Sequence, residues 1–457
     1  MKKDFYFPGY HFRPEKNWMN DPNGLIWKDG WYHLFFQYNP WADTWGNIHW
    51  GHARSKDLIH WEMCPIALAP SNEQGEIHCY SGCAVEYQGG VKLFYTSIGQ
   101  GERGPENGAE QWAAVNEDAE LIRWKKCKKP ALKQEINKDT VISMWRDPFI
   151  WKEGSVYRLL LSGTCKKKGC IALYESKNLE EWEFCSILYQ SKEYELIECP
   201  NIMKFGERYV LLYSPLDAVR YAIGKINPDT KELMVEAEGV FDYSIGKKGF
   251  YAPNTYLNAP EKRYLVIGCL FEGDRLNSKR ERGWAGMQSL PREVTLQEGK
   301  LHIQPANECR MLRKEILNRM HEGTKKTSAS GRQLELEVSY RPKADTVVKI
   351  VLLASADGDE KTILELDYAR KRIFLNRKSS TLYDDVSKED IVVPLCPSEQ
   401  EVSVDIFVDH SAIEIFYNNE ITLSARVFTK KEDSIYSEIT VLGQADILRG
   451  TIYKLEL

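Results

Sequence analysis

The sequence predicts an all-β protein: a five-bladed β-propeller followed by a C-terminal β-sandwich, with a short helical linker between them. Two observations indicate the propeller, because one unit occurs five times and a second motif repeats with nearly the same period. A third observation indicates the sandwich, because the C-terminal part consists of short segments in which apolar and polar residues alternate.

The repeated unit is a short polar or acidic segment, usually ending in proline, that leads into an apolar strand, a turn and a second apolar strand. Successive units lie 60, 66, 52 and 53 residues apart, which is long enough for several strands each. In the first unit, Leu25–Trp27 and Trp31–Gln37 flank an Asp-Gly turn, the pattern of a β-hairpin. The five units begin at Asn20-Asp21-Pro22, Tyr80-Ser81-Gly82, Arg146-Asp147-Pro148, Glu198-Cys199-Pro200 and Tyr251-Ala252-Pro253.

The second motif has an acidic or amide residue, then leucine, then tryptophan three positions after the leucine. Its copies are Asp57–Trp61, Glu120–Trp124 and Asn178–Trp182, which recur 63 and 58 residues apart. We expect each copy to close the outer part of a blade. Chance repetition within a sandwich is a weaker explanation, because two independent markers share one period.

We place the propeller at residues 1–305, a linker with a short helix at 306–330 and the sandwich at 331–457. The spacing of Leu, Met and Ile over 307–318 predicts the helix, and the polar segment 323–331 predicts a loop. No catalytic constellation is recognisable in the sandwich sequence. Its alternating segments are 334–338, 347–353, 362–366, 402–408, 412–416 and 452–457.

Composition narrows the class of partner. The net charge of −5 argues against a nucleic-acid-binding protein, because such proteins are basic. No apolar stretch reaches the roughly 18 residues of a membrane helix. Aromatic residues make up 12% of the chain, which suits both strands and the binding of sugar rings. Eleven cysteines without a CxxC pair, and no visible secretory signal, lead us to expect reduced thiols and a cytoplasmic protein.

Three carboxylates occupy the same place in three of the repeated units: Asp21, Asp147 and Glu198. Proline follows both aspartates, so we expect their backbone to be extended at the entrance of a strand. Equivalent positions of different blades converge around the propeller axis. The repeat therefore predicts that these three acids meet in one pocket.

Clustered carboxylates separate their pKa values, so that one group holds a proton while another stays ionised. Glycoside hydrolysis needs this pair, a proton donor for the leaving oxygen and an anion at the anomeric carbon. Metal binding is the rival use of three carboxylates. The neighbouring aromatic residues favour a sugar over a hydrated cation; they are Trp18, Trp41, Trp45, Tyr80 and Trp145.

The segment Trp18–Gly24, with the sequence WMNDPNG, resembles the signature of glycoside hydrolase family 32, the invertase and β-fructosidase family. The resemblance spans nearly the whole chain and includes the sandwich segment Val408–Phe416. Its further motifs are Phe36–Pro40, Trp45–Ala53, Tyr80–Gly82, Arg146–Pro148, Glu198–Pro200, Phe250–Pro253, Gly283–Gly286 and Pro291-Arg292.

This resemblance implies a retaining β-fructosidase with a five-bladed propeller and a sandwich. Asp21 would be the nucleophile, Glu198 the acid/base, and Asp147 would hold ring hydroxyls and stabilise the oxocarbenium-like transition state. Arg146 would bind nearby carboxylates or hydroxyls. The fructose pocket would be lined by Asn20, Gln37, Trp45, Ser81 and Trp284. The partner would be a small carbohydrate. No metal or organic cofactor would be needed. Whether the chain forms a homo-oligomer is left open.

Two departures from the family pattern put the substrate and linkage in doubt. Gly249 stands where the family often has Asp, and Ile197 and Asn201 flank Glu198-Cys199-Pro200 where the family often has Trp and Asp. Basic runs suggest a phosphate contact for sucrose 6-phosphate, for which Arg280 and Arg282 are the best candidates.

Three alternative functions stay open at this point. A fructosyltransferase would use the same site with a sugar hydroxyl in place of water. A noncatalytic fructan-binding protein would keep the scaffold without needing both reacting acids. A five-bladed arabinan or xylan hydrolase would keep three acids but lack the WMNDPNG motif.

Overall fold

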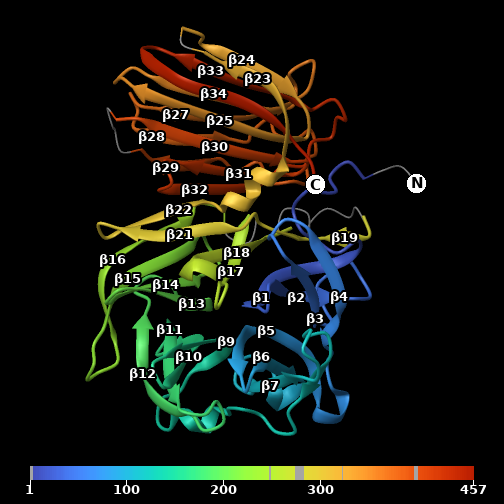
Figure 1. The fold of residues 1–457 in the computed structure, drawn as a ribbon, viewed down its shortest axis with the longest axis vertical. Helices are drawn as coiled ribbons and strands as arrows, with labels where there is room; N and C mark the ends of the chain where they lie inside the picture. Colours follow the sequence, from blue (N-terminus) through green and yellow to red (C-terminus); the bar gives the residue numbers. More distant parts are fainter. Residues whose placement is uncertain (1–3, 246–248, 273–281, 322, 396–399) are drawn as a thin grey trace.

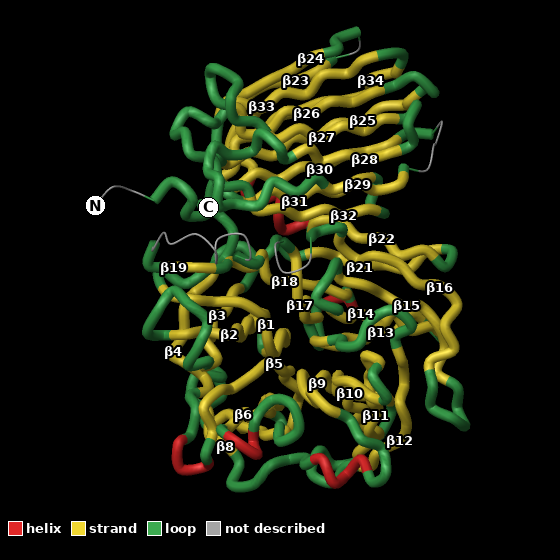
Figure 2. Tube along the Cα trace, turned by 180° about the vertical axis from the view of Figure 1, so that it is seen from behind, coloured by secondary structure: helices red, strands yellow, loops and turns green. Residues whose placement is uncertain are grey.

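The computed structural model describes residues 4–245, 249–272, 282–321, 323–395 and 400–457. Figure 1 shows a ring of blades in the lower half and a two-layer stack of strands above it, with the C-terminus near the junction. In the described part of the chain the named helices are short 3-10 turns, drawn red in Figure 2. They are η1 (Asn72–Gln74), η2 (Gly101–Arg103), η3 (Gln134–Asn137), η5 (Pro260–Lys262) and η6 (Asn307–Leu312).

The lower half contains five sheets within the described ranges, one for each repeated unit and antiparallel except where β19 joins the first, so the predicted five-bladed propeller is confirmed. Blade 1 contains β1 (Asn17–Lys28), β2 (Trp31–Asn39), β3 (His49–Ser55) and β4 (Trp61–Leu68). Blade 2 contains β5 (Glu76–Tyr87), β6 (Gly90–Gly99), β7 (Glu110–Asn116) and β8 (Trp124–Lys126). Blade 3 contains β9 (Ser143–Glu153), β10 (Val156–Cys165), β11 (Lys168–Ser176) and β12 (Glu183–Gln190).

Blades 4 and 5 complete the ring. Blade 4 contains β13 (Glu198–Phe205), β14 (Arg208–Ser214), β15 (Val219–Ile226) and β16 (Leu233–Asp242). Blade 5 contains β17 (Phe250–Thr255), β18 (Tyr264–Leu270), β20 (Met287–Gln288), β21 (Arg292–Gln297) and β22 (Lys300–Pro305). The segment β19 (Trp284–Ala285) leaves blade 5 and pairs in parallel with β1, with Asn17 opposite Trp284, so it ties the last blade to the first.

The Leu-Trp motif forms the turn between the third and fourth strands of blades 1, 2 and 3, as predicted. Leu58, Leu121 and Leu179 lie in these turns with φ values of 66°, 58° and 63°. The indole nitrogens of Trp61 and Trp124 donate to the carbonyls of Leu58 and Leu121 at 3.1 and 3.0 Å. In blades 1 and 2 the tryptophan therefore stabilises a turn with left-handed backbone geometry, which is uncommon for residues other than glycine.

The upper half is a sandwich of two six-stranded sheets among the described residues. The first sheet contains, in spatial order, β23 (Arg313–Met320), β34 (Ala445–Leu455), β25 (Gln333–Pro342), β30 (Val402–Asp409), β31 (Ala412–Tyr417) and β32 (Ile421–Arg426). The second contains β24 (Lys326–Ser330), β33 (Tyr436–Leu442), β26 (Val347–Ala354), β27 (Thr362–Asp367), β28 (Arg372–Asn376) and β29 (Ile391–Pro394). Alternate residues of these strands fill one apolar core, as the period-two pattern predicts.

The predicted linker is wrong in two respects. The helical part ends at Leu312, and Arg313–Met320 is strand β23 rather than the second half of a helix. The segment predicted as a loop contains β24 (Lys326–Ser330). In both cases pairing with β34 and β33 supplies the backbone hydrogen bonds, and this tertiary pairing outweighs the local sequence preference.

A buried group of charges joins the two halves. Arg292 of β21 is fully buried, and its guanidinium lies 2.8 Å from Asp242 of the propeller and 2.6 Å from Glu414 of the sandwich. Guanidinium groups suit such positions because their planar donors match two carboxylates at once. Breaking a buried pair of this kind leaves an uncompensated charge, so the contact holds the sandwich against blades 4 and 5.

His11 links the N-terminal segment to the same group. Its ring nitrogens lie 2.8 Å from Asp409 and 2.9 Å from Glu414, and all three side chains are buried. Burial disfavours the charged ring, but the hydrogen bonds to the two carboxylates outweigh burial and raise the pKa of His11 to about 9. His11 is therefore a cation at neutral pH.

We predict that His11→Gln destabilises the protein by about 3 kcal/mol at pH 6, because two buried carboxylates lose a shared cation. The pKa of His11 is raised, so its contribution is complete below pH 6.5 and is lost as the pH rises through about 9. Thermal unfolding at pH 6 and pH 10 should show a large difference from wild type at pH 6 and a smaller one at pH 10. The exposed pair of His60 and Asp57 supplies the control, since His60→Gln should change stability little. Equal losses for the two variants would contradict the assignment.

Candidate active site

A cavity of about 510 Å³ opens at the propeller axis where the innermost strands of the blades begin. Asp21, Asp147 and Glu198 all line it, so the three acids meet in one pocket as the repeat predicts. The other residues that line the cavity are Trp18, Asn20, Gln37, Trp45, Tyr80, Ser81, Met144, Arg146, Leu196, Cys199, Leu216, Tyr251 and Phe271.

Irregular strand pairing turns these side chains toward the axis. The register of β1 against β2 shifts between Met19 and Pro22, and that of β13 against β14 shifts between Glu198 and Asn201. β5 and β17 carry the same kind of shift at the start of their units. A β-bulge re-aims side chains and interrupts the ladder, which is compatible with a proline that has no N–H to donate.

The backbone of Asp147 differs from the extended geometry that its following proline led us to expect. Its φ is 61°, in the left-handed region, and Cys199 beside Glu198 has a φ of 50°. Proline directs the preceding residue toward extended geometry, so Asp147 and Cys199 both depart from that preference. Such backbone geometry is uncommon for residues other than glycine and clusters at functional sites.

Asp21 is held by a chain of donors. Ser81 Oγ donates to Asp21 Oδ2 at 2.6 Å, and Asn20 Nδ2 donates to Asp21 Oδ1 at 2.9 Å. Gln37 Nε2 donates to Ser81 Oγ at 2.6 Å, and the indole of Trp18 donates to Asn20 at 2.7 Å. Donors of this kind favour the ionised carboxylate and fix the direction in which it points.

Glu198 lies between a phenol and a guanidinium. Tyr251 Oη donates to Glu198 Oε2 at 2.7 Å, and Arg146 Nη2 lies 3.2 Å from Glu198 Oε1. Burial and the charge of Glu198 raise the pKa of Tyr251 well above its ordinary value, so the phenol keeps its proton. The Leu216 N–H donates to the same phenol at 3.0 Å and holds it in place.

Asp147 is the most buried of the three acids. The Cys199 N–H donates to its Oδ2 at 3.0 Å, and Arg146 Nε lies 4.0 Å from the same oxygen. Burial raises the pKa of Asp147 to about 6, with Arg146 opposing the rise and Glu198 and Asp21 adding to it. The cluster therefore holds a proton more readily than separate carboxylates would.

Cys199 contacts two of the acids without being a nucleophile itself. Its Sγ lies 3.8 Å from Asp21 Oδ2 and 3.7 Å from Asp147 Oδ2. Burial and the neighbouring carboxylates raise the pKa of the thiol well above its ordinary value, so it stays protonated. The thiol is a hydrogen-bonding neighbour, in agreement with its position in the sequence.

Among the other predicted site residues, Trp45 lines the cavity with 47% of its surface exposed, while Trp284 does not line it. Trp284 is buried behind β1, where its indole donates to Asp4 at 2.6 Å. Trp41 and Trp145 also lie outside the lining, Trp41 in solvent and Trp145 within the core of blade 3. Their proximity to the acids in the sequence does not carry over to the pocket.

Tyr251 is the polar contact that sequence reasoning missed. It begins the fifth repeated unit and stands two residues before Pro253, as Glu198 stands two residues before Pro200. This shared position relative to the proline could have predicted that Tyr251 lies beside Glu198. Met144, Leu196, Leu216 and Phe271 also line the cavity, and no sequence signal singled them out.

The departures from the family pattern lie outside the cavity lining. An added Cβ at Gly249 would stand 2.6 Å from Ser244 Cβ and 2.7 Å from the carbonyl oxygen of Ser424, so a larger side chain has no room there. Asn201 donates to the carbonyl of Pro253 at 2.8 Å and joins blades 4 and 5. Ile197 is buried in the core shared by blades 2, 3 and 4.

Of the two candidate phosphate contacts, Arg280 lies outside the described residues. The guanidinium of Arg282 lies 3.2 Å from Asp4 and 3.6 Å from the centre of the Tyr6 ring, and Arg282 does not line the cavity. Arg282 holds the N-terminal segment in place. Among the described residues, no three or more His, Cys, Asp and Glu side chains are grouped as a metal site would require.

The profile of the glycosyl hydrolases family 32 N-terminal domain matches residues 11–305, and that of the family 32 C-terminal domain matches residues 308–454. The chain belongs to glycoside hydrolase family 32. It is 30% identical to a sucrose-6-phosphate hydrolase of Zymomonas mobilis, over 93% of this chain and 88% of the relative. It is 29% identical to a raffinose invertase of Escherichia coli, over 98% and 95% of the two chains.

Among solved structures, the exo-inulinase of Aspergillus awamori superimposes with a TM-score of 0.83 at 27% identity, over 100% of this chain and 99% of that one. As a member of glycoside hydrolase family 32, with glycosidases as relatives along its length, the protein is a glycosidase.

Within the described ranges, no helix has the length and apolar character that a membrane crossing needs.

We predict that Asp147→Asn stabilises the free protein increasingly as the pH rises. The pKa of Asp147 is raised, so wild-type stability is complete below its ordinary value of 3.8 and falls as the pH rises through about 6. Asn does not titrate, so the stability difference between variant and wild type should shift by about 2 kcal/mol in favour of the variant between pH 4.5 and pH 8. Denaturant unfolding at both values measures this shift. A difference that does not change with pH would rule out the raised pKa.

Proposed function

We propose that this enzyme is a retaining β-fructosidase that releases terminal fructofuranosyl units through a covalent fructosyl-enzyme intermediate. The observation that carries the proposal is the cavity in which Asp21 is held by Ser81 and Asn20 while Glu198 is held separately by Tyr251 and Arg146. Two carboxylates with different surroundings can take the two different roles of glycoside hydrolysis.

In the first step, Asp21 attacks C2 of the fructosyl unit and the bond from C2 to the glycosidic oxygen breaks. Asp21 suits this role because donors to both of its oxygens favour the ionised form and fix its orientation. Glu198 gives its proton to the departing oxygen, which leaves as a hydroxyl. A retaining pair of this kind requires carboxyl groups about 5–5.5 Å apart, which stays a prediction here.

In the second step, a water molecule attacks C2 and releases Asp21. Glu198, now ionised, takes a proton from that water, so the enzyme returns to its starting state. Tyr251 and Arg146 both contact Glu198 and keep it directed into the cavity. The acid of the first step is therefore the base of the second.

Asp147 supports both steps as an acceptor for ring hydroxyls and as a negative charge near the oxocarbenium-like transition state. Arg146 lies within 4.0 Å of both Asp147 and Glu198 and couples the two acids electrostatically. Because the pKa of Asp147 is about 6, this carboxyl is mostly ionised at neutral pH, as both of these roles require.

The substrates that we propose are sucrose, sucrose 6-phosphate and short fructo-oligosaccharides. Half-exposed Trp45 and its neighbour Tyr80, with ring centres 6.2 Å apart, form the aromatic part of the cavity beyond the acids. The names of the relatives, a sucrose-6-phosphate hydrolase, a raffinose invertase and an exo-inulinase, support a terminal fructosyl unit as the shared element. We also propose a cytoplasmic location, which the reduced cysteines of the described chain support.

We predict that Asp21→Asn and Glu198→Gln each lower kcat for sucrose by about 10³-fold or more, because each removes one reacting group. Glu198→Gln should also accumulate a fructosyl-enzyme from a fructoside with a good leaving group, because attack by Asp21 then needs no acid but release of the intermediate lacks its base. Intact-protein mass spectrometry detects this adduct. Asp229→Asn, in an exposed turn of blade 4, is the matched control and should keep wild-type activity. Full activity in Asp21→Asn would defeat the nucleophile assignment.

The rival fructosyltransferase differs from a hydrolase only in the acceptor. We predict that incubation with concentrated sucrose yields glucose and fructose in equal amounts, because the open cavity admits water to C2. Growing fructo-oligosaccharides with an excess of free glucose would favour transfer instead. The same assay with sucrose 6-phosphate, inulin-type and levan-type oligomers ranks the proposed substrates, and release of arabinose or xylose from the matching polymers would favour the third alternative.

A further inference from the structure

The two residues after β18, Phe271 and Glu272, connect the active site with the sandwich. Phe271 lines the active-site cavity. Glu272 is buried, and its Oε1 lies 2.8 Å from Nη1 of Arg426, a fully buried residue at the end of β32 in the sandwich. The same guanidinium donates to the Leu270 carbonyl at 3.1 Å. A side chain of the sandwich therefore contacts the direct neighbour of a residue that lines the cavity.

Phe271 touches the supports of both proposed reacting acids. Its ring lies edge-to-face against Trp18, with ring centres 5.7 Å apart, and against Tyr251, with ring centres 6.5 Å apart. The indole of Trp18 starts the chain of donors that ends at Asp21. The phenol of Tyr251 donates to Glu198 at 2.7 Å. A displacement of this one ring would therefore disturb the supports of both acids.

Glu272 also fixes β1 just before the proposed nucleophile. Its Oε1 accepts from the Gly286 N–H at 3.1 Å. Gly286 packs so closely on β1 that an added Cβ would stand 2.0 Å from the Met19 carbonyl oxygen. Two residues further along, Gln288 donates to the Asn20 carbonyl at 2.8 Å. One buried carboxylate thus holds the backbone against which the start of β1 rests.

Arg426 is anchored within the sandwich as well. Its Nη2 donates to Ser411 Oγ at 2.8 Å, so one guanidinium holds a hydroxyl of the sandwich together with a carboxylate and a carbonyl of the propeller. The planar fork of donors makes this possible. A lysine ammonium is a compact charge on a flexible stem, so it would keep the charge without the fixed geometry.

We propose that Arg426 of the sandwich is a positioning residue of the glycosidase reaction, acting through its buried ion pair with Glu272. The pair fixes Phe271 and Gly286, and these fix the supports of the two reacting acids. Arg426 does not line the cavity, so it acts only through these residues. The inference rests on the proposed function, in which Asp21 and Glu198 carry the two steps. It gives the sandwich a part in catalysis.

The test compares Arg426→Lys and Glu272→Gln with wild type in sucrose hydrolysis, below the unfolding temperature of each protein. Each variant should lower kcat by about 5-fold or more, because small misplacements of reacting groups reduce rates strongly. KM should change by less than about 2-fold, since neither side chain lines the cavity. A loss confined to KM, with wild-type kcat, would overturn the proposal.

The double variant tests whether the two residues act as one unit. Its kcat should fall no further than that of the more impaired single variant, because both changes break the same ion pair. Losses that multiply would show independent effects and overturn the proposal. Glu272→Gln keeps the size of the side chain, so it supplies the decisive kcat if the lysine variant does not fold.

Arg292→Lys is the matched control at the same interface. Arg292 is another fully buried arginine whose guanidinium pairs with a propeller carboxylate and a sandwich carboxylate, and it does not line the cavity. This variant should lose stability but keep kcat within about 2-fold of wild type. An equal loss of kcat would overturn the proposal, since any weakening of the interface would then have the same effect.

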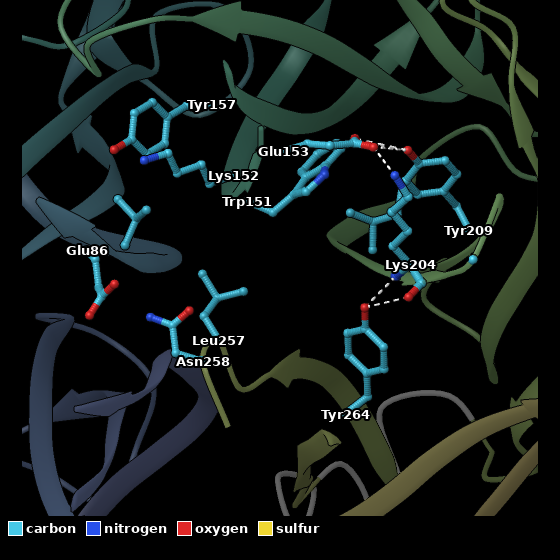
Figure 3. Close-up of a pocket in the computed structure, with 13 residues that line it drawn as sticks. Glu86, Trp151, Lys152, Glu153, Tyr157, Lys204, Tyr209, Leu257, Asn258 and Tyr264 are labelled. Carbon is cyan, nitrogen blue, oxygen red and sulfur yellow. Dashed lines mark hydrogen bonds and ion pairs between the residues drawn. The ribbon is translucent and has the colours of Figure 1, made fainter. Parts of the chain in front are cut away.

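Glu153→Gln is a second control, within the strand that carries Asp147. Glu153 ends β9 and pairs with Lys204. Both line a second cavity, of about 470 Å³, at the other end of the propeller axis, and Figure 3 shows them side by side. This variant should keep wild-type kcat. A loss equal to that of Glu272→Gln would overturn the proposal, because any disturbance of the inner strands would then suffice.

Failure of this proposal is distinguishable from failure of the proposed function. Full activity in Asp21→Asn would defeat the proposed function, whatever the Arg426 variant does. Wild-type kcat in Glu272→Gln, beside a strong loss in Asp21→Asn, would overturn the positioning role alone.

Discussion

The constraint on which the site depends is the crowding of three carboxylates into one cavity, with the guanidinium of Arg146 beside two of them. Arg146 lies within ion-pair distance of Asp147 and Glu198, while Asp21 depends on neutral donors from Ser81 and Asn20. Fully ionised, the three acids exceed the single cation by two charges, which a low-dielectric pocket tolerates poorly. Burial is the main cause of the raised pKa of Asp147, and the charges of Glu198 and Asp21 add to the rise while Arg146 opposes it.

Such a cluster is stable only on a rigid frame. The blades supply the frame because each acid stands at a bulge of an innermost strand, and β19 ties blade 5 back to blade 1. The sandwich adds to it from outside the ring, since Arg292 and His11 join buried carboxylates of both halves. The two charged clusters differ. At the interface of propeller and sandwich, Arg292 and His11 pair with carboxylates, whereas in the active site the carboxylates outnumber the Arg146 cation.

The propeller axis has two ends with different chemistry. At the end where the inner strands begin, acids, an amide and a half-exposed tryptophan surround the place for a reacting sugar. At the other end, aromatic side chains and charged groups of both signs line a second cavity. Since the same strands pass from one end to the other, residues a few positions apart in one strand serve separate cavities.

The sequence by itself determined the all-β class, the five blades and the meeting of Asp21, Asp147 and Glu198, because a repeated unit places equivalent residues at equivalent positions around an axis. The same local pattern misplaced the linker helix, since pairing of β23 with β34 outweighed the spacing of its apolar residues. Only the tertiary structure decided that Trp284 lies behind β1, that Arg282 holds the N-terminal segment and that Tyr251 reaches Glu198. These contacts join residues far apart in the chain, and their geometry depends on the packing between blades, which local sequence does not encode.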